Sequence, residues 1–267
     1  MQTSAELDVM MSAVRHVRCA MLDGFSRIQS LSIDVADAKA FVADLDQHVA
    51  QEVSGALIKA FPAYGLLMEG ADELIGAEPM RRWIVDPMDG TANFENGLPH
   101  WAISIALEHK GQIIAAVVYD PFKDELFSAT TGGGAWLNGQ TRLHTSGKAS
   151  LSQGTLSTGM PPSGSDNLPL ALATLGALLN DCAGVRQLGA AVLDLAYVAA
   201  GRLDGYWNRN LKAWHFVAGA FLVQEAGGLV KPLGADPQGI DAGNIVGIVS
   251  SMFPEFDAAL QVAQERV

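Results

Sequence analysis

The sequence predicts an α+β first half that continues into an α/β second half. Three observations favour this class. Apolar residues recur at helical spacing between residues 5 and 30. A long β-rich stretch then covers residues 101–139. After a segment rich in Ser, Gly and Pro, residues 152–167, helical and strand-like runs alternate to the end of the chain.

The first half opens with two predicted helices. One covers residues 5–30, and a second covers residues 44–60 and is stopped by Pro62. "RRWIVDPMDG" is then a short strand that runs into a turn. The stretch 101–139 is a meander, because its β-rich runs are interrupted by "KG", "DPFKD" and "TGGG". The apolar positions that define the first helix are Leu7, Met10, Met11, Val14, Val17 and Met21.

The second half contains three predicted helices. The first covers residues 168–181, and the second lies in "LDLAYVAAGRLDGYW" with Gly201 at its carboxyl end. The third is "AWHFVAGAFLVQEAGG", closed by Gly227 and Gly228. The segment 152–167 is the favoured boundary between the halves, since Ser, Gly and Pro are typical of loops.

Composition restricts the function. Of the 267 residues 49% are apolar and 17% charged, which predicts a folded protein with a large core. The formal net charge of −12 would repel nucleic acid and anionic membranes, so we expect neither as a partner. No apolar run is long enough for a membrane span, and we expect a cytoplasmic protein. Cys19 and Cys182 are interpreted as two buried free thiols in a reducing compartment.

The stretch "WIVDPMDGTANF" places Asp86 and Asp89 at the end of an apolar strand. Pro87 fixes φ, so the turn can direct both carboxylates to one point, with the Met88 carbonyl between them. Two like charges so close raise each other's pKa, and a divalent cation removes that cost. Oxygen ligands of this kind suit Mg²⁺.

The Gly90-Thr91 step predicts a helix or tight turn whose backbone N–H groups can receive a phosphate. Metal and phosphate would then meet at one place, as in metal-assisted phosphate hydrolysis. The alternative is that the two aspartates only cap a turn, because Asp-Pro and Asp-Gly are ordinary turn pairs.

The sequence around this turn, "WIVDPMDGTANFENGLPHWAISIAL", resembles the first signature of the inositol monophosphatase family. The likeness continues through "AAVVYDPFKDELFSATTGGGAWLNG". It resumes in "LDLAYVAAGRLDGYWNRNLKAWHFVAGAFLVQEAGGLV", which is similar to the second signature, and in all it covers roughly residues 40–250. The resemblance implies a layered αβαβα sandwich of the sugar-phosphatase type, Mg²⁺-dependent hydrolysis of small phosphate monoesters, and a homodimer.

The resemblance implies roles for particular residues. Asp46 and Thr91 would position the attacking water and help to deprotonate it. The alternative for Asp46 is a solvated acid near a helix N-terminus. The loop before Asp46 has Ala43 where the family has Thr, and Gly70 replaces the second Glu of a Gly-Glu-Glu element. The implied metal ligands are Glu69, Asp86, the Met88 carbonyl, Asp89 and the residue at position 215.

The largest departure from the family is His215, which stands where the family has Asp after Trp. An imidazole nitrogen suits Mn²⁺ or Zn²⁺ better than Mg²⁺, so these metals are alternatives. His215 is either a ligand or a packed residue at the start of a helix beside Trp214. His100 is interpreted as structural. The residues implied to bind phosphate or substrate are Gly90, Thr91, Ala92, Gly189, Ala190 and Asn208, of which Asn208 replaces a family Glu.

The sequence is compatible with two functions that belong to different classes, an enzyme and an interaction module. The first is a phosphoric monoester hydrolase, with residues 1–145 carrying the metal and phosphate turn and residues 146–267 completing the site. The substrate would be inositol-phosphate-like or sugar-phosphate-like. Asn208 and the loss of a hydroxyl at Ala190 point away from inositol phosphate itself. The second is a catalytically weakened family member that acts mainly as a regulatory or protein-interaction module. The intact "DPMDGT" favours the enzyme.

Overall fold

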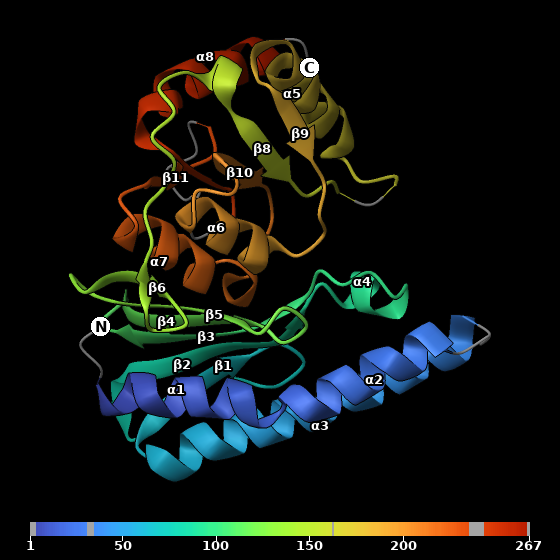
Figure 1. Cartoon of the computed structure of the whole chain (residues 1–267), viewed down its shortest axis with the longest axis vertical. Helices are drawn as coiled ribbons and strands as arrows, with labels where there is room; N and C mark the ends of the chain where they lie inside the picture. The colour runs from blue at the N-terminus through green and yellow to red at the C-terminus, as the bar shows by residue number, and fades with distance from the viewer. Residues whose placement is uncertain (1–3, 31–34, 162, 235–242, 266–267) are drawn as a thin grey trace.

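A computed structural model describes residues 4–30, 35–161, 163–234 and 243–265. Figure 1 shows that helices and sheets alternate as layers along the long axis of the molecule. The order begins with helices α1 (Ala5–His16), α2 (Arg18–Ser30) and α3 (Val35–Ala60), followed by a seven-stranded sheet. Helices α6 (Ala191–Ala199) and α7 (Val217–Glu225) come next, then a five-stranded sheet, and last helices α5 (Leu168–Asp181) and α8 (Phe253–Gln264). The αβαβα sandwich predicted from the resemblance is therefore confirmed.

Two of the predicted helices have different bounds. The helix predicted over residues 5–30 is two helices, α1 (Ala5–His16) and α2 (Arg18–Ser30). The apolar periodicity could not show the break, because Val17 is itself buried and continues the stripe. Helix α3 (Val35–Ala60) begins well before residue 44. As a result Asp46 lies within a long helix and not near the N-terminus of one.

The first sheet confirms the predicted meander. Its strands follow the order of the chain, with β1 parallel to β2 and every later pair antiparallel. Lys110 and Gly111 both have positive φ, 54° and 75°, which is typical of a tight hairpin. The strands are β1 (Tyr64–Met68), β2 (Glu78–Asp89), β3 (Ala102–His109), β4 (Gln112–Asp120), β5 (Glu125–Thr130), β6 (Gly134–Leu137) and β7 (Thr141–Arg142).

The second sheet has the order β11-β12-β10-β8-β9 and mixes parallel and antiparallel pairs. The segment 152–167, predicted as a boundary loop, contains strand β8 of this sheet. Small polar residues do not prevent a strand there, because Leu156 is buried between neighbouring strands. The strands are β8 (Thr155–Thr158), β9 (Gly184–Arg186), β10 (Gly205–Asn208), β11 (Leu229–Pro232) and β12 (Ile245–Ile248).

Helices α6 (Ala191–Ala199) and α7 (Val217–Glu225) lie between the two sheets and contact strands of both. They are therefore buried on most sides. Gly201 has φ of +68° just after α6, as expected for its carboxyl end. The third predicted helix is divided, since Ala213–His215 forms a 3₁₀ turn before α7 begins. The remaining helices are α4 (Thr91–Glu95), α5 (Leu168–Asp181) and α8 (Phe253–Gln264), with short 3₁₀ turns at Leu151–Gln153 and Ser250–Met252.

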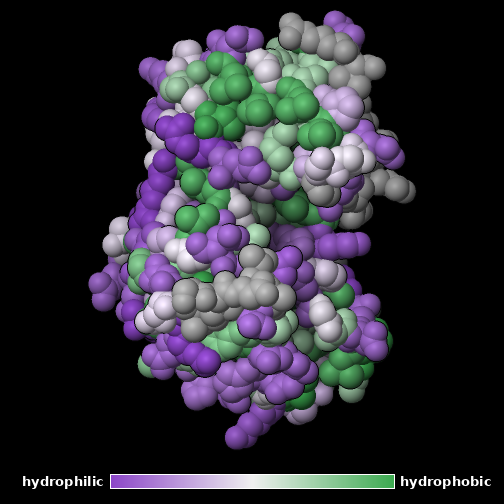
Figure 2. All heavy atoms as spheres, turned by 90° about the vertical axis from the view of Figure 1, so that its right-hand side faces the viewer, coloured by the Kyte–Doolittle hydropathy of each residue, from purple (hydrophilic) through white to green (hydrophobic). Residues whose placement is uncertain are grey.

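The surface differs between the two ends of the molecule. Figure 2 shows apolar side chains gathered toward the top of that view, whereas the lower part is mostly hydrophilic. Exposed apolar residues of the outer helices include Leu172 and Leu179 of α5. Within the described residues, no helix has the length and apolarity needed to cross a membrane. The prediction of two buried thiols is wrong for Cys19, which is exposed, and Cys182 is half-buried.

Candidate metal and phosphate site

An irregularity in strand β2 brings Asp86 and Asp89 to the same face of the first sheet. In a regular strand, residues three apart point to opposite faces. Here Asp86 pairs with Ser104 and Asp89 with Ala102, so three steps on β2 match two on β3. Both aspartates therefore share the face of Ala102, which packs toward α6 and α7, while Met88 packs in the core beneath α1–α3.

The two aspartates are buried carboxylates with few donors. Asp86 Oδ1 accepts a hydrogen bond from the Met88 amide at 3.0 Å, and Asp89 Oδ2 accepts one from the Val192 amide at 2.7 Å. Burial raises the pKa of Asp86 well above its ordinary value, and the charge of Glu69 raises it further. Burial also raises the pKa of Asp89, and the charge of Asp86 raises it further. Keeping these two buried carboxylates charged costs free energy, and a bound cation would offset that cost.

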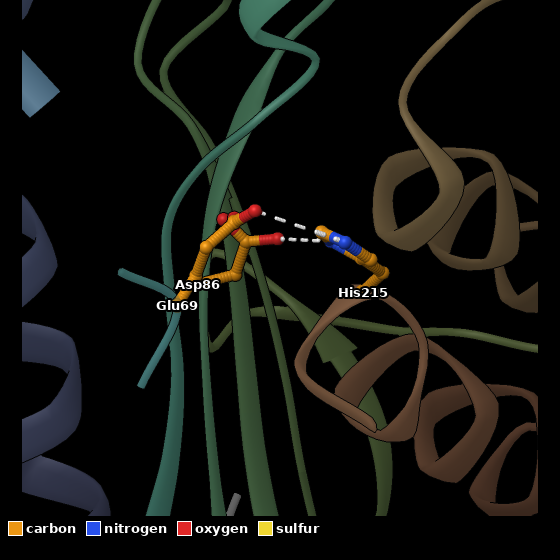
Figure 3. A group of neighbouring side chains, drawn as sticks. All are labelled: Glu69, Asp86 and His215. Atoms are coloured by element: carbon orange, nitrogen blue, oxygen red, sulfur yellow. Dashed lines mark hydrogen bonds and ion pairs between the residues drawn. The ribbon is translucent and has the colours of Figure 1, made fainter. Parts of the chain in front are cut away.

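Glu69 and His215 complete a cluster with Asp86 (Figure 3). Glu69 directly follows β1, and His215 comes from the 3₁₀ turn before α7. His215 Nδ1 lies 3.0 Å from Asp86 Oδ2, and its Nε2 lies 3.8 Å from Glu69 Oε1. One ligand atom from each of the three side chains lies within 4.8 Å of the others.

This donor set fits a divalent cation. Carboxylate oxygens suit Mg²⁺, and an imidazole nitrogen extends the choice toward Mn²⁺ or Zn²⁺. Asp89 is not one of the three clustered side chains, but its charge interacts with those of Asp86 and His215. The Met88 carbonyl accepts a hydrogen bond from the Thr91 hydroxyl at 2.9 Å, which leaves a second lone pair on that oxygen.

Asp46 and Thr91 are not hydrogen-bonded to each other. The Thr91 hydroxyl donates to Met88, and Asp46 Oδ1 is buried without a hydrogen-bond partner. Asp46 and Glu69 line one cavity of about 360 Å³, which extends from α3 to the end of β1. Burial and then the charge of Glu69 raise the pKa of Asp46 to about 6. An unpaired carboxylate with that pKa can accept a proton near neutral pH.

The turn Gly90–Ala92 meets the loop before α6. Gly90 has φ of +91°, and a Cβ there would lie 3.1 Å from the Cβ of Ala190. The Asn93 amide group joins the two segments, because it donates to the carbonyl oxygens of His100 and Leu188, each at 2.7 Å. Gly189 also packs on Asn93. Asn93 lies inside the motif "WIVDPMDGTANF", but its role could not be predicted from the sequence because it is a contact with a distant loop.

A cavity of about 290 Å³ opens beside Asp89 and His215. Of the predicted substrate residues, Gly189, Ala190 and Asn208 line it, whereas Gly90, Thr91 and Ala92 are absent from its described lining. The other residues of this lining are Thr158, Gly159, Met160, Gln187, Ala191, Asp194, Tyr206 and Leu211.

Asp194, for which the sequence predicted no role, joins three segments beside this cavity. One of its oxygens lies 2.8 Å from His100 Nε2, and the other accepts a hydrogen bond from the Ser157 hydroxyl. His100 follows α4, Ser157 belongs to β8 and Asp194 to α6. The interpretation of His100 as structural agrees with this contact, since the bond fixes α6, and with it the Val192 amide that reaches Asp89.

Comparison with known proteins gives consistent matches. The family model described as inositol monophosphatase family matches residues 4–266. The chain is 42% identical over 246 residues to an inositol-1-monophosphatase of Rhizobium meliloti, covering 92% of each chain. It is 41% identical over 248 residues to a protein of Pseudomonas aeruginosa named Nus factor SuhB, covering 90% of each.

Solved structures agree with these sequence matches. Extragenic suppressor protein suhB from Bartonella henselae superimposes with a TM-score of 0.86 at 36% identity, covering 97% of this chain and 100% of that one. With a nearly full-length family match, close relatives and the same layered fold, the chain belongs to the inositol monophosphatase family.

Proposed function

We propose that this protein hydrolyses a small phosphate monoester in a reaction that depends on a divalent cation. The observation that carries the proposal is the convergence of two buried carboxylates, Asp86 and Asp89, with Glu69 and His215 beside a cavity. The residues that would hold metal are Glu69, Asp86, the Met88 carbonyl, Asp89 and His215. A bound Mg²⁺, Mn²⁺ or Zn²⁺ would supply Lewis-acid stabilisation of phosphoryl oxygens and a more acidic water.

The side chains have separate tasks in this proposal. Asp46 accepts a proton from the attacking water through its unpaired Oδ1, and Thr91 holds the turn by its bond to Met88. Backbone N–H groups of the turn Gly90–Ala92 would receive the phosphate, as those at a helix start can. Gly189, Ala190 and Asn208 contact the rest of the substrate. The Asn93 bonds keep these two segments together, so both can contact one substrate.

Phosphate release across a panel of phosphomonoesters tests this function. The protein is freed of metal with a chelator and then assayed with Mg²⁺, Mn²⁺ and Zn²⁺ in turn. We expect release that requires added metal and is absent in the chelator. If no ester releases phosphate with any of the three metals, the hydrolase function is contradicted and the second candidate function is favoured.

The second candidate is a regulatory or protein-interaction role. It is favoured by the relatives named Nus factor SuhB and by the departures at Gly70, Asn208 and His215. The expectation that nucleic acid is not a partner derives from the net charge of −12 alone and stays a prediction. A protein with this role would keep its partner binding when Asp89 is changed to Asn, whereas the hydrolase would lose turnover.

The acid limb of the pH–rate profile should report Asp46. Burial raises its pKa to about 6, so the base is protonated and inactive below that pH. We expect kcat/KM to fall as pH decreases below about 6. The acid limb should shift to lower pH as the concentration of divalent cation is raised, because the cation favours the charged carboxylate. Initial rates from pH 5 to 8, with Asp46→Asn as comparison, check this. An unchanged acid limb in that variant would assign the limb to another group.

We also propose that the protein is a homodimer. The family resemblance implies it, and exposed apolar side chains such as Leu172, Leu179 and Val262 offer surface that a partner could cover. Light scattering at micromolar concentration should give about twice the mass of one chain. A monomer at that concentration would contradict this proposal without affecting the hydrolase.

A further inference from the structure

A small second cavity adjoins the proposed substrate cavity. Its volume is about 30 Å³, and it lies where strand β10 ends and the chain continues toward the 3₁₀ turn that carries His215. The two cavities share the lining residues Thr158, Gly159, Met160 and Asn208. The two cavities therefore adjoin at these four residues.

Arg209 lines the small cavity, and among the described residues nothing neutralises its charge. Its Nη2 is buried without a hydrogen-bond acceptor, and in the described parts of the chain no carboxylate forms an ion pair with it. Burial lowers the pKa of the guanidinium, and no charge raises it. A half-buried cation without a counter-charge costs free energy, which an anionic ligand would recover.

The residue before Arg209 carries no charge. Asn208 stands where the family resemblance implies a glutamate, and its amide is held in place from both ends. Its nitrogen donates to the Tyr206 hydroxyl at 2.9 Å, and its oxygen accepts from the Arg209 backbone N–H at 2.7 Å. It also packs directly on Gly159, where an added Cβ would lie 2.3 Å from Asn208 Nδ2. The side chain at 208 is thus neutral and fixed, and it lines the same small cavity as Arg209.

Charge around the two cavities is otherwise unfavourable to a second anion. Asp89 and Asp194 line the larger cavity, and the whole chain has a net charge of −12. Among the described residues that line either cavity, Arg209 is the only Lys or Arg. A second anionic group on the substrate would therefore find its one fixed cationic partner at Arg209.

Resting on the proposed hydrolase function, we infer that the substrate is a phosphate monoester with a second anionic group, and that Arg209 binds this group. A volume of about 30 Å³ suits a compact carboxylate better than a second phosphate. The inference names a substrate class, carboxylated phosphate monoesters, and a specificity residue outside the metal cluster.

Matched substrates test the inference. 3-Phosphoglycerate and glycerol 3-phosphate share a three-carbon phosphate ester, but the first has a carboxylate where the second has a hydroxymethyl group. We expect kcat/KM to be at least about tenfold higher for 3-phosphoglycerate. Arg209→Gln should lower this ratio by about tenfold to a hundredfold. Lys212→Gln, which removes the same charge from a nearby exposed side chain, should leave the ratio unchanged.

A second variant guards against a trivial loss of folding. Asn208→Glu places a carboxylate beside Arg209, and it should lower the same ratio by neutralising the guanidinium inside the protein. Fructose 1,6-bisphosphate and fructose 6-phosphate form another matched pair. A preference for the bisphosphate alone, lost in Arg209→Gln, would support an anion site at Arg209 but overturn the choice of a carboxylate.

The outcomes separate the inference from the function on which it rests. Hydrolysis of both three-carbon esters at equal kcat/KM, or an equal loss for both in Arg209→Gln, would overturn the inference and keep the hydrolase. If no ester is hydrolysed, the proposed function fails. Calorimetric binding of 3-phosphoglycerate to the wild type and to Arg209→Gln then decides the anion site, since equal affinities would overturn it.

Discussion

Asp89→Asn should abolish metal-dependent phosphate release and, at the same time, stabilise the metal-free protein. The substitution removes one carboxylate charge from the cluster, so kcat/KM should fall by at least about a hundredfold. The fold should persist, because the amide oxygen of Asn can still accept the hydrogen bond from the Val192 amide. Phosphate-release kinetics measure the first effect, and thermal unfolding in chelator measures the second.

The direction of the stability effect follows from the raised pKa values. Asp86 and Asp89 have folded-state pKa values above the unfolded value of about 3.9, so the folded protein binds more protons. In the metal-free protein, the contribution of these two carboxyl groups to stability is therefore fully present below the unfolded pKa of about 3.9 and is lost as pH rises through the raised folded-state pKa values. Asp89→Asn removes the part of this loss of stability that Asp89 causes. Each kcal/mol gained in the free energy of unfolding raises the unfolding midpoint by about 2–4 °C.

A matched control is Asp181→Asn, which makes the same chemical change at an exposed residue at the end of α5. It should change neither turnover nor the pH dependence of unfolding. Near-normal hydrolysis by Asp89→Asn, with metal still bound, would remove Asp89 from the proposed site.

His215→Asp should increase turnover supported by Mg²⁺. His215 contacts Asp86 and faces Glu69, so a carboxylate in its place adds one negative charge where the cation would bind. A hard cation should then bind more tightly, and we expect at least about a tenfold gain in Mg²⁺ affinity. Without metal, the added charge should lower the unfolding midpoint, since it joins two carboxylates that already repel each other.

Metal titrations of phosphate release for both proteins, on the same esters, check this prediction. The wild type should be helped more by Mn²⁺ or Zn²⁺ than by Mg²⁺, as an imidazole donor favours those ions. His144→Asp, the same change at an exposed site, should have no effect on the metal titration. A wild type that is fully active with Mg²⁺ and crippled by His215→Asp would show that the histidine is a specific adaptation. If His215→Asp shows no gain in turnover with any of the metals, the regulatory role is favoured.

The sequence predicted the local structure well where the signal was local. The helix over 168–181, the meander and the glycine after α6 were all visible from periodicity and turn residues. Predictions failed at boundaries that tertiary packing sets. The break at Val17 was hidden by continuous burial, and α3 begins at Val35, nine residues before the predicted start at residue 44.

By itself, the sequence determined the family, the layered fold and most side chains of the proposed site, because the two motifs are long and specific. Only the tertiary structure decided how these side chains meet. The bulge in β2 turns Asp86 and Asp89 to one face, and His215 reaches Asp86 across 129 positions of the chain. Arg209 gave no signal in the sequence, since the orphaned Nη2 and the small cavity around it depend on how distant segments pack. Contacts between distant segments depend on how whole layers pack, and no local pattern of residues encodes that arrangement.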